Sequence, residues 1–165
     1  MWVQAALSTM PPGPAFSMKN VHKSVLIWYS PEEMFALVTD VAKYPEFLPW
    51  CDHASVLASE PDGMKAEIGI SFAGIRQTFT TRNTHVPGRE VRMKLVDGPF
   101  SNLDGCWKFL PLGQGDQRAC KVTLEMRYSF KSAALAAVVG PVFDKIAGSL
   151  VDAFVKRAEQ VYGKK

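Results

Sequence analysis

The sequence predicts an α+β domain in which one curved antiparallel sheet of about six to seven strands packs around a single long C-terminal helix. Two observations predict this class. Apolar and polar residues alternate with period two through most of the segment from Ala54 to Phe130, and one long apolar helical stripe follows it. The 165 residues, 47% of them hydrophobic, suffice for one globular domain. The sheet must bury one face, and the only long helix is the element available to cover it.

The N-terminal part of the domain predicts a strand followed by a capped helix. The strand covers Val21–Tyr29, where β-branched and aromatic residues run without a breaker. The helix begins after Ser30, because Ser30 can cap it, Pro31 suits its first position and Glu33 completes a capping box. Asp40 is expected to cap a second helix, which the prolines at positions 45 and 49 keep short.

Six further strands are expected between Ala54 and Phe130, and turn signals separate them. These signals are Pro61-Asp62-Gly63, Gly74, Pro87-Gly88, Asp97-Gly98-Pro99 and the polar stretch from Gly113 to Gln117. Ser132 can then cap the last helix, and Gly163 is expected to end it. Gly140-Pro141 is expected to kink or break this helix near its start.

Composition and charge narrow the class of protein. Lys and Arg number 19 and Asp and Glu 16, and the net charge of +3 permits an anionic partner without requiring one. No uncharged apolar run reaches the ~18 residues of a membrane span, so an integral membrane protein is not expected. The first 17 residues carry no charge. They are expected to be a disordered tail or an extension ahead of a natural start at Met18, and the domain then covers residues 18–163.

The sequence contains no motif that predicts catalysis or metal binding. It has no dinucleotide fingerprint, no Walker motif and no Gly-x-Ser-x-Gly elbow, and its three histidines lie in separate segments without a zinc spacing. Neither a catalytic residue nor a metal site is therefore predicted. Cys51, Cys106 and Cys120 are odd in number and irregularly spaced, which fits a reducing compartment and small buried side chains.

The strand alternation assigns bulky, soft side chains to the inner face of the sheet. An ordinary core explains any one of them, but together they indicate an apolar pocket between the curved sheet and the helix. The members are Phe72, Phe79, Met93, Trp107, Phe109, Met126, Tyr128 and Phe130. The candidate polar groups in the same register are Gln77, Thr81, Asp97 and Tyr128, although Asp97 at a strand end also suits a turn.

The outer face of the sheet is predicted to be basic. Seven basic residues share the outward register, against the acids Asp104 and Glu125: Arg76, Arg82, Arg92, Lys94, Lys108, Lys121 and Arg127. This bias fits either a solvated sheet face or a surface for phosphate-rich RNA or anionic lipid head groups. Because no aromatic stacking motif accompanies it, an RNA contact would be to shape and backbone.

Several motifs resemble one known family. Tyr44-Pro-Glu-Phe-Leu-Pro-Trp-Cys51 follows the first helix, Phe79-Thr-Thr-Arg-Asn83 comes next, and Leu95-Val-Asp-Gly-Pro-Phe100 runs into Leu103-Asp-Gly-Cys-Trp-Lys-Phe109. In order and spacing they resemble the START-like polyketide-cyclase superfamily, in particular the branch that holds the coenzyme Q-binding proteins and the bacterial ribosome-association toxins. The resemblance covers about Met18 to Gly163.

This resemblance implies a helix-grip fold with a hydrophobic tunnel between sheet and helix, which binds ubiquinone or a similar polyprenyl lipid. The segments Tyr44–Cys51 and Asp97–Trp107 are then expected near the tunnel mouth. The residues expected to contact the lipid are Phe35, Tyr44, Phe47, Trp50, Phe72, Phe79, Met93, Leu95, Trp107, Phe109, Met126, Tyr128, Phe143, Ile146 and Leu150.

Three functions follow as hypotheses. The first is a non-enzymatic lipid-binding protein that supports respiration and requires no cofactor. The second is a ribosome-association toxin that binds the large ribosomal subunit through the basic face and blocks subunit joining. The third is a cyclase or aromatase, although the sequence offers no evident acid–base pair for it. The expected partners are a quinone lipid, with the large ribosomal subunit or a membrane surface as alternatives, and no DNA. The expected location is the cytoplasm, or the periphery of the inner membrane.

Overall fold

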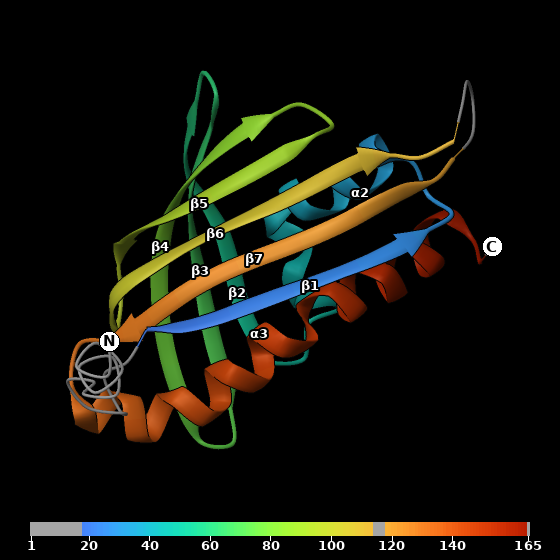
Figure 1. The fold of residues 1–165 in the computed structure, drawn as a ribbon. Helices are drawn as coiled ribbons and strands as arrows, with labels where there is room; N and C mark the ends of the chain where they lie inside the picture. Colours follow the sequence, from blue (N-terminus) through green and yellow to red (C-terminus); the bar gives the residue numbers. More distant parts are fainter. Residues whose placement is uncertain (1–17, 114–117, 165) are drawn as a thin grey trace, which may run out of the picture.

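A computed structural model describes residues 18–113 and 118–164 of the chain, and the predicted tail at 1–17 lies outside this range. Seven strands form one antiparallel sheet in the order β1-β7-β6-β5-β4-β3-β2 (Figure 1). They are β1 (Lys19–Ile27), β2 (Cys51–Glu60), β3 (Gly63–Phe72), β4 (Ile75–Val86), β5 (Glu90–Asp97), β6 (Phe100–Pro111) and β7 (Cys120–Phe130). The predicted α+β class, sheet and long C-terminal helix are confirmed.

Three helical segments accompany the sheet within the residues that the structure describes. They are α2 (Pro31–Thr39), the 3₁₀ helix η2 (Val41–Glu46) and α3 (Ala133–Tyr162), and α3 runs along the open side of the curved sheet (Figure 1). The predicted capping box is present, because Ser30 Oγ accepts from the Glu33 N–H and Glu33 Oε1 accepts from the Ser30 N–H. Ser132 Oγ accepts from the Leu135 N–H and so caps α3, as predicted.

Two helix predictions differ from the structure. Asp40 precedes η2 but makes no side-chain capping bond to it. The helix α3 is not broken at Pro141, since its 30 residues run from Ala133 through the proline to Tyr162. Because Pro141 and Ala137 both lie on the exposed side, the carbonyl that loses its helical partner at the proline faces water, which can hydrogen-bond it.

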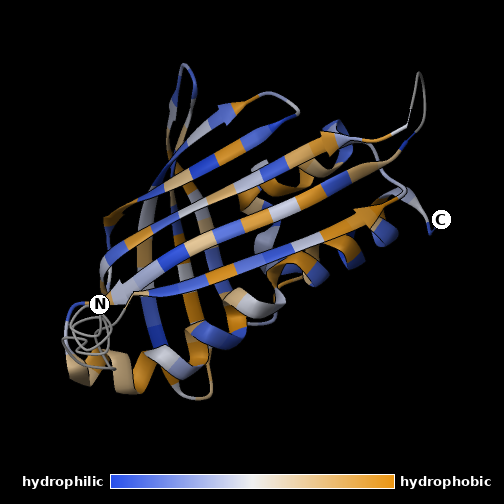
Figure 2. Ribbon diagram, viewed as in Figure 1, coloured by the Kyte–Doolittle hydropathy of each residue, from blue (hydrophilic) through white to orange (hydrophobic). Residues whose placement is uncertain are grey.

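The core lies between the concave face of the sheet and α3. Hydropathy alternates along the strands, as expected for a sheet with one buried face (Figure 2). One cluster of rings packs around Phe143, whose centroid lies 4.7 Å from that of Tyr128 and 4.9 Å from that of Phe100. A second cluster packs around Phe154, with Trp107 at 5.2 Å and Tyr44 at 5.4 Å. These aromatic residues therefore gather at the sheet–helix interface.

The composition of α3 reflects its place in this core. Within the described part of the chain, α3 is the one helix that is long and apolar enough by composition to cross a membrane. Its apolar residues include Val139, Phe143 and Ile146, which are buried against the sheet. The core helix of a globular domain has the same length and apolar composition, and packing against the sheet accounts for the buried third of the apolar segment.

Candidate functional site

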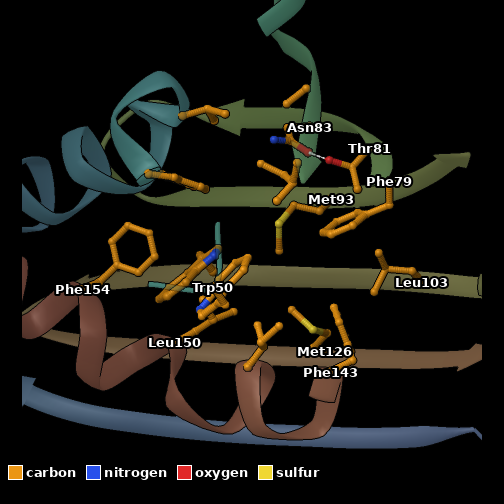
Figure 3. A pocket seen from close by; sticks show the side chains of 16 residues that line it. Trp50, Phe79, Thr81, Asn83, Met93, Leu103, Met126, Phe143, Leu150 and Phe154 are labelled. Atoms are coloured by element: carbon orange, nitrogen blue, oxygen red, sulfur yellow. Dashed lines mark hydrogen bonds between the residues drawn. The ribbon is translucent and has the colours of Figure 1, made fainter. Parts of the chain in front are cut away.

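An apolar cavity of about 80 Å³ lies between the concave sheet face and α3 (Figure 3). Its walls come from η2, five strands and α3. Sixteen residues line it: Val41, Tyr44, Trp50, Ala66, Ile68, Phe79, Thr81, Asn83, Met93, Leu103, Trp107, Met126, Phe143, Ile146, Leu150 and Phe154. None of the sixteen carries a formal charge, so the cavity suits an uncharged group.

Nine of the fifteen residues expected to contact a lipid line this cavity. They are Tyr44, Trp50, Phe79, Met93, Trp107, Met126, Phe143, Ile146 and Leu150. Both segments expected near a tunnel mouth contribute, because Tyr44 and Trp50 come from the first and Leu103 and Trp107 from the second. The sequence therefore places these nine residues in the cavity wall, while ligand contact stays a prediction.

The other six lie outside the cavity wall. Phe35 and Phe109 pack edge-to-face against each other, and Phe47 lies under the Arg157 guanidinium with 4.9 Å to its centroid. The Phe72 ring is 38% exposed at the end of β3. Leu95 is half-buried against the core, and the Tyr128 hydroxyl is taken by Asp144. Each of these six is held by packing or hydrogen bonding elsewhere, or lies at the surface.

Seven lining residues were not among the predicted contacts: Val41, Ala66, Ile68, Thr81, Asn83, Leu103 and Phe154. Thr81 had been assigned only as an inward polar group. Strand alternation already places Ala66, Ile68 and Leu103 inward, and helical spacing places Phe154 on the buried face of α3. Asn83 was missed because the inward register was followed only as far as Thr81, whereas β4 continues to Val86. Carrying the alternation two residues further would have found it.

The polar groups of the cavity are few and neutral. The Thr81 hydroxyl donates to Asn83 Oδ1 at 2.8 Å, and the Tyr44 hydroxyl donates to the Val38 carbonyl. Among the described residues that line the cavity, Tyr44 is the only ionisable one, and burial raises the pKa of its hydroxyl. A general acid or base needs a pKa near the working pH, so Tyr44 does not suit this role.

The remaining inward polar candidates serve structural contacts. Tyr128 donates to Asp144, whose second carboxylate oxygen lies 2.6 Å from Lys19 Nζ, and these bonds connect β7, α3 and β1. Asp97 accepts from the Gly98 N–H at 3.0 Å, which is the turn role open to it. Gln77 is half-buried on β4 and does not line the cavity.

The outer face of the sheet is less basic than the alternation predicted. Four of the seven basic residues pair with acids, at N···O distances between 2.6 and 3.9 Å: Arg76 with Asp52, Arg82 with Glu60, Arg92 with Glu90 and Arg127 with Asp104. The sequence had assigned only two acids, Asp104 and Glu125, to this face. The other three acids are Asp52 and Glu60 from β2 and Glu90 from the first position of β5. Within residues 18–113 and 118–164, Lys94, Lys108 and Lys121 have no acid within 4.0 Å.

A second, more polar depression lies on this outer face. It measures about 460 Å³ and is lined in part by Arg92, Lys94, Asp104, Glu125 and Arg127. Side chains of both charges line it. Of its basic residues, Arg92 and Arg127 pair with Glu90 and Asp104, while Lys94 has no acid within 4.0 Å in the described part of the chain.

The part of the chain that the structure describes offers no evident metal site and no activated cysteine. It holds no group of three or more His, Cys, Asp or Glu side chains placed to bind a metal ion. All three cysteines are buried and free. Burial raises the pKa of Cys51 to about 11 and that of Cys120 to about 12, so these thiols are poor nucleophiles at neutral pH.

Comparison with known proteins adds to this geometry. Residues 27–155 match the model of a family described as polyketide cyclase / dehydrase and lipid transport. The ribosome association toxin RatA of Vibrio cholerae is 47% identical over 88% of this chain and 99% of that protein. The mitochondrial Coenzyme Q-binding protein COQ10 homolog B of Xenopus laevis is 29% identical over 86% of this chain and 59% of that protein.

Solved structures agree on the fold. The 18 kDa protein CC1736 from Caulobacter crescentus matches with a TM-score of 0.68 and 31% identity, over 88% of this chain and 99% of that one. The Zhui aromatase/cyclase from a Streptomyces species matches with a TM-score of 0.71 and 18% identity, over 87% of this chain and 95% of that one. The second likeness concerns the fold alone, since the sequences have diverged too far to carry a function.

Proposed function

Because the chain belongs to the family of polyketide cyclases, dehydrases and lipid transport proteins, we propose that it acts without catalysis, as a ribosome-associating protein of the toxin type. One observation carries this proposal: the 47% identity to a ribosome association toxin extends over 99% of that protein. The coenzyme Q-binding relative is less similar, and the match spans little more than half of it. The comparisons thus favour the second hypothesis from the sequence over the first.

In this proposal the partner is the large ribosomal subunit, and binding there blocks subunit joining. Ribosomal RNA presents phosphates, and lysines without acidic partners are the groups that can exchange counterions for them. Lys94 on β5 and Lys108 on β6 meet that condition on the outer face. Arg92 and Arg127 contribute less, because their guanidinium groups already contact Glu90 and Asp104. A cytoplasmic location follows from such a partner.

Co-sedimentation with purified large subunits tests this proposal. The double variant K94E/K108E should bind more weakly, and the slope of log affinity against log salt should flatten by about two. The matched control is K156E, a charge reversal at a lysine on the opposite element, α3, which should leave binding unchanged. If K94E/K108E sediments with the subunit as the unmodified protein does at every salt concentration, the outer-face contact is wrong. If no form sediments, ribosome association itself is wrong.

A second candidate function is storage or delivery of an apolar lipid, and the cavity between sheet and α3 favours it. The lining is uncharged and offers no acid or base near neutral pKa, which supports binding rather than turnover. Each Å² of apolar surface buried there contributes ~25 cal/mol. The name of the coenzyme Q-binding relative suggests a polyprenyl quinone such as ubiquinone as the lipid.

A substitution that fills the cavity with a larger side chain distinguishes ribosome association from lipid binding. Ala66 is buried in the wall, so A66L places three additional carbons in the space a lipid would occupy. We expect the lipid recovered by organic extraction of purified protein to fall at least about fivefold, since overpacking costs about 1–3 kcal/mol. A36L makes the same substitution at an exposed position of α2 and should change nothing. Ribosome co-sedimentation should survive A66L. Equal lipid in A66L and A36L would contradict lipid binding at this cavity.

A further inference from the structure

The outer face of the sheet exposes large apolar side chains at one of its ends. At this end β1 and β6 finish and β7 begins, and the three strands lie side by side (Figure 1). Leu26 is 68% exposed, Trp28 63% and Leu110 56%. Single exposed apolar residues are common on protein surfaces, but a group of them indicates a contact surface. These residues therefore mark a candidate interface.

The register of the sheet places a lysine between the two leucines. Lys121 on β7 lies directly opposite Leu26 on β1 and directly opposite Leu110 on β6. Directly opposed residues share a face, so the three side chains form one row across the strands. Neighbouring strands are about 4.8 Å apart, which leaves the leucines roughly 10 Å apart with the lysine stem between them. Trp28 lies two residues beyond Leu26, just past the end of β1. We refer to Leu26, Trp28, Leu110 and Lys121 as the end patch.

The end patch carries positive charge that is not neutralised by a neighbouring acid in the described part of the chain. There, Lys121 has no carboxylate within 4.0 Å, and neither has Lys108 in the next row of the same face. Farther along β7 on this face the pattern changes, because Arg127 pairs with Asp104 at 3.3 Å. Exposed apolar area and unpaired lysines therefore coincide at one end of the sheet.

This combination decides which partner fits the end patch. An RNA backbone would bind the lysine but gain little from two leucines. A second copy docked about a two-fold axis would bring the same patch against Lys121, and the two ammonium groups would repel each other. A bilayer with anionic lipids offers an apolar region to the leucines and negative head groups to the lysine, and tryptophan is favoured at the boundary between them. The end patch matches such a bilayer in both respects.

We propose that the end patch is a docking surface for an anionic lipid bilayer. Leu26, Trp28 and Leu110 enter the boundary between head groups and acyl chains, while Lys121 keeps its ammonium group at the level of the head groups. The inference is independent of both candidate functions, since no residue of the end patch lines the cavity or belongs to the Lys94–Lys108 pair. Such docking is peripheral and reversible, because only a few side chains insert.

Co-sedimentation with vesicles of two compositions tests the charge of the surface. One composition is phosphatidylcholine alone, and the other is equal parts of phosphatidylcholine and phosphatidylglycerol. The protein should bind the anionic vesicles at least about fivefold more tightly, since a lysine near such a surface contributes about that factor. K121E should remove most of this preference, whereas the control K156E, at an exposed lysine of α3, should keep it. Binding to neither vesicle, or equal binding to both, would overturn the proposal.

Apolar variants assign the binding to the end patch. L26N/L110N should weaken binding to the anionic vesicles at least about tenfold, because the two side chains no longer gain from leaving water. The matched control L57N/V138N replaces exposed apolar residues on β2 and α3 and should bind as the unmodified protein does. Full vesicle binding by a folded L26N/L110N contradicts the proposal. Loss of co-sedimentation with large ribosomal subunits alone would identify the end patch as a ribosomal contact instead.

Trp28 provides a direct readout of insertion. Its indole is exposed in the free protein, so its fluorescence should shift to shorter wavelength when it enters the bilayer boundary. W28F should abolish the shift, since Trp50 and Trp107 are already buried and keep their surroundings. A shift that persists in W28F would place another tryptophan at the bilayer and refute the assignment. Thermal unfolding of each variant reports its folding. If L26N/L110N fails to fold, K121E and the Trp28 shift provide the test.

Discussion

The three cysteines are buried residues whose chemistry the fold suppresses. Cys51 begins β2, Cys106 lies in β6 and Cys120 begins β7. Burial is the first cause of the raised pKa in each, and nearby carboxylates add to it. The thiols therefore act as small apolar side chains, as their scarcity and irregular spacing predicted.

Thiol labelling at pH 8 should accordingly be slow in the folded protein. Raising the pKa of Cys51 from 9.0 to about 11 lowers its thiolate fraction roughly a hundredfold. A disulfide reagent should therefore react at least about a hundredfold faster once the protein is unfolded in guanidinium chloride. One thiol that reacts at the unfolded rate would show that its segment opens.

The same groups predict how stability responds to alkaline pH. Above pH 9 the unfolded chain loses thiol protons that the folded chain keeps, because the folded pKa values are higher. The unfolded state then binds fewer protons than the native state, so the free energy of unfolding falls as pH rises through this range. Chemical denaturation between pH 8 and about pH 10.5 measures the slope, and the double variant C51A/C120A should reduce it. A slope that the double variant leaves unaltered would assign the pH dependence to other groups.

Residue pairs also explain why the outer face is less basic than expected. Arg82 pairs with Glu60 across the width of one strand, since β3 lies between β4 and β2. Such a pair depends on strand order and register, which alternation along a single strand does not report. Exposed pairs of this kind add little stability, but they remove charge that a partner would otherwise meet.

At the scale of elements, the start of α2 is the boundary that the sequence predicts most sharply. The reciprocal bonds of Ser30 and Glu33 satisfy two donors at the helix start, and Glu33 also holds Arg118, which precedes β7, at 2.6 Å. The capping box thus joins α2 to a segment 85 positions away in sequence.

Removing the cap should weaken the fold measurably. S30A is expected to lower the free energy of unfolding by ~1 kcal/mol, because the Glu33 N–H then has only water to bond. The control S149A removes an exposed hydroxyl inside α3, which bonds only the Ile146 carbonyl, and should be neutral or slightly stabilising. Urea denaturation followed by circular dichroism compares them. Equal midpoints for the two variants would mean that the cap contributes nothing.

Element prediction succeeded where local chemistry decides the outcome. Caps, turns and strand alternation are encoded within a few residues, so Ser30, Ser132 and Gly74 were placed correctly; Gly74 indeed adopts φ +81°. Pro141 was assigned too strong an effect, because its consequence depends on whether the freed carbonyl faces solvent. The orientation of the Asn83 amide is set by its hydrogen bond with Thr81, and the alternation of apolar and polar residues does not predict this bond.

At the scale of the whole molecule, the volume of the cavity limits the size of the molecule that can bind without a change in the structure. About 80 Å³ is well below the ~300–1,000 Å³ of typical small-molecule pockets. A polyprenyl chain therefore requires movement of the surrounding side chains or of α3 away from the sheet. The sequence predicted most of the wall but not this volume, because volume depends on how far side chains from seven different elements interpenetrate.

The pairing of β1 with β7 has a consequence for the order in which the chain folds during synthesis. The strand that leaves the ribosome first, Lys19–Ile27, finds its neighbour Cys120–Phe130 about 100 residues later in synthesis. Until then β1 has both edges open, whereas β2 to β5 can pair as successive hairpins as soon as they emerge. The sheet should accordingly grow from its β2 edge and close last at β1 and α3, which makes this a slow-folding topology whose earliest strand pairs last.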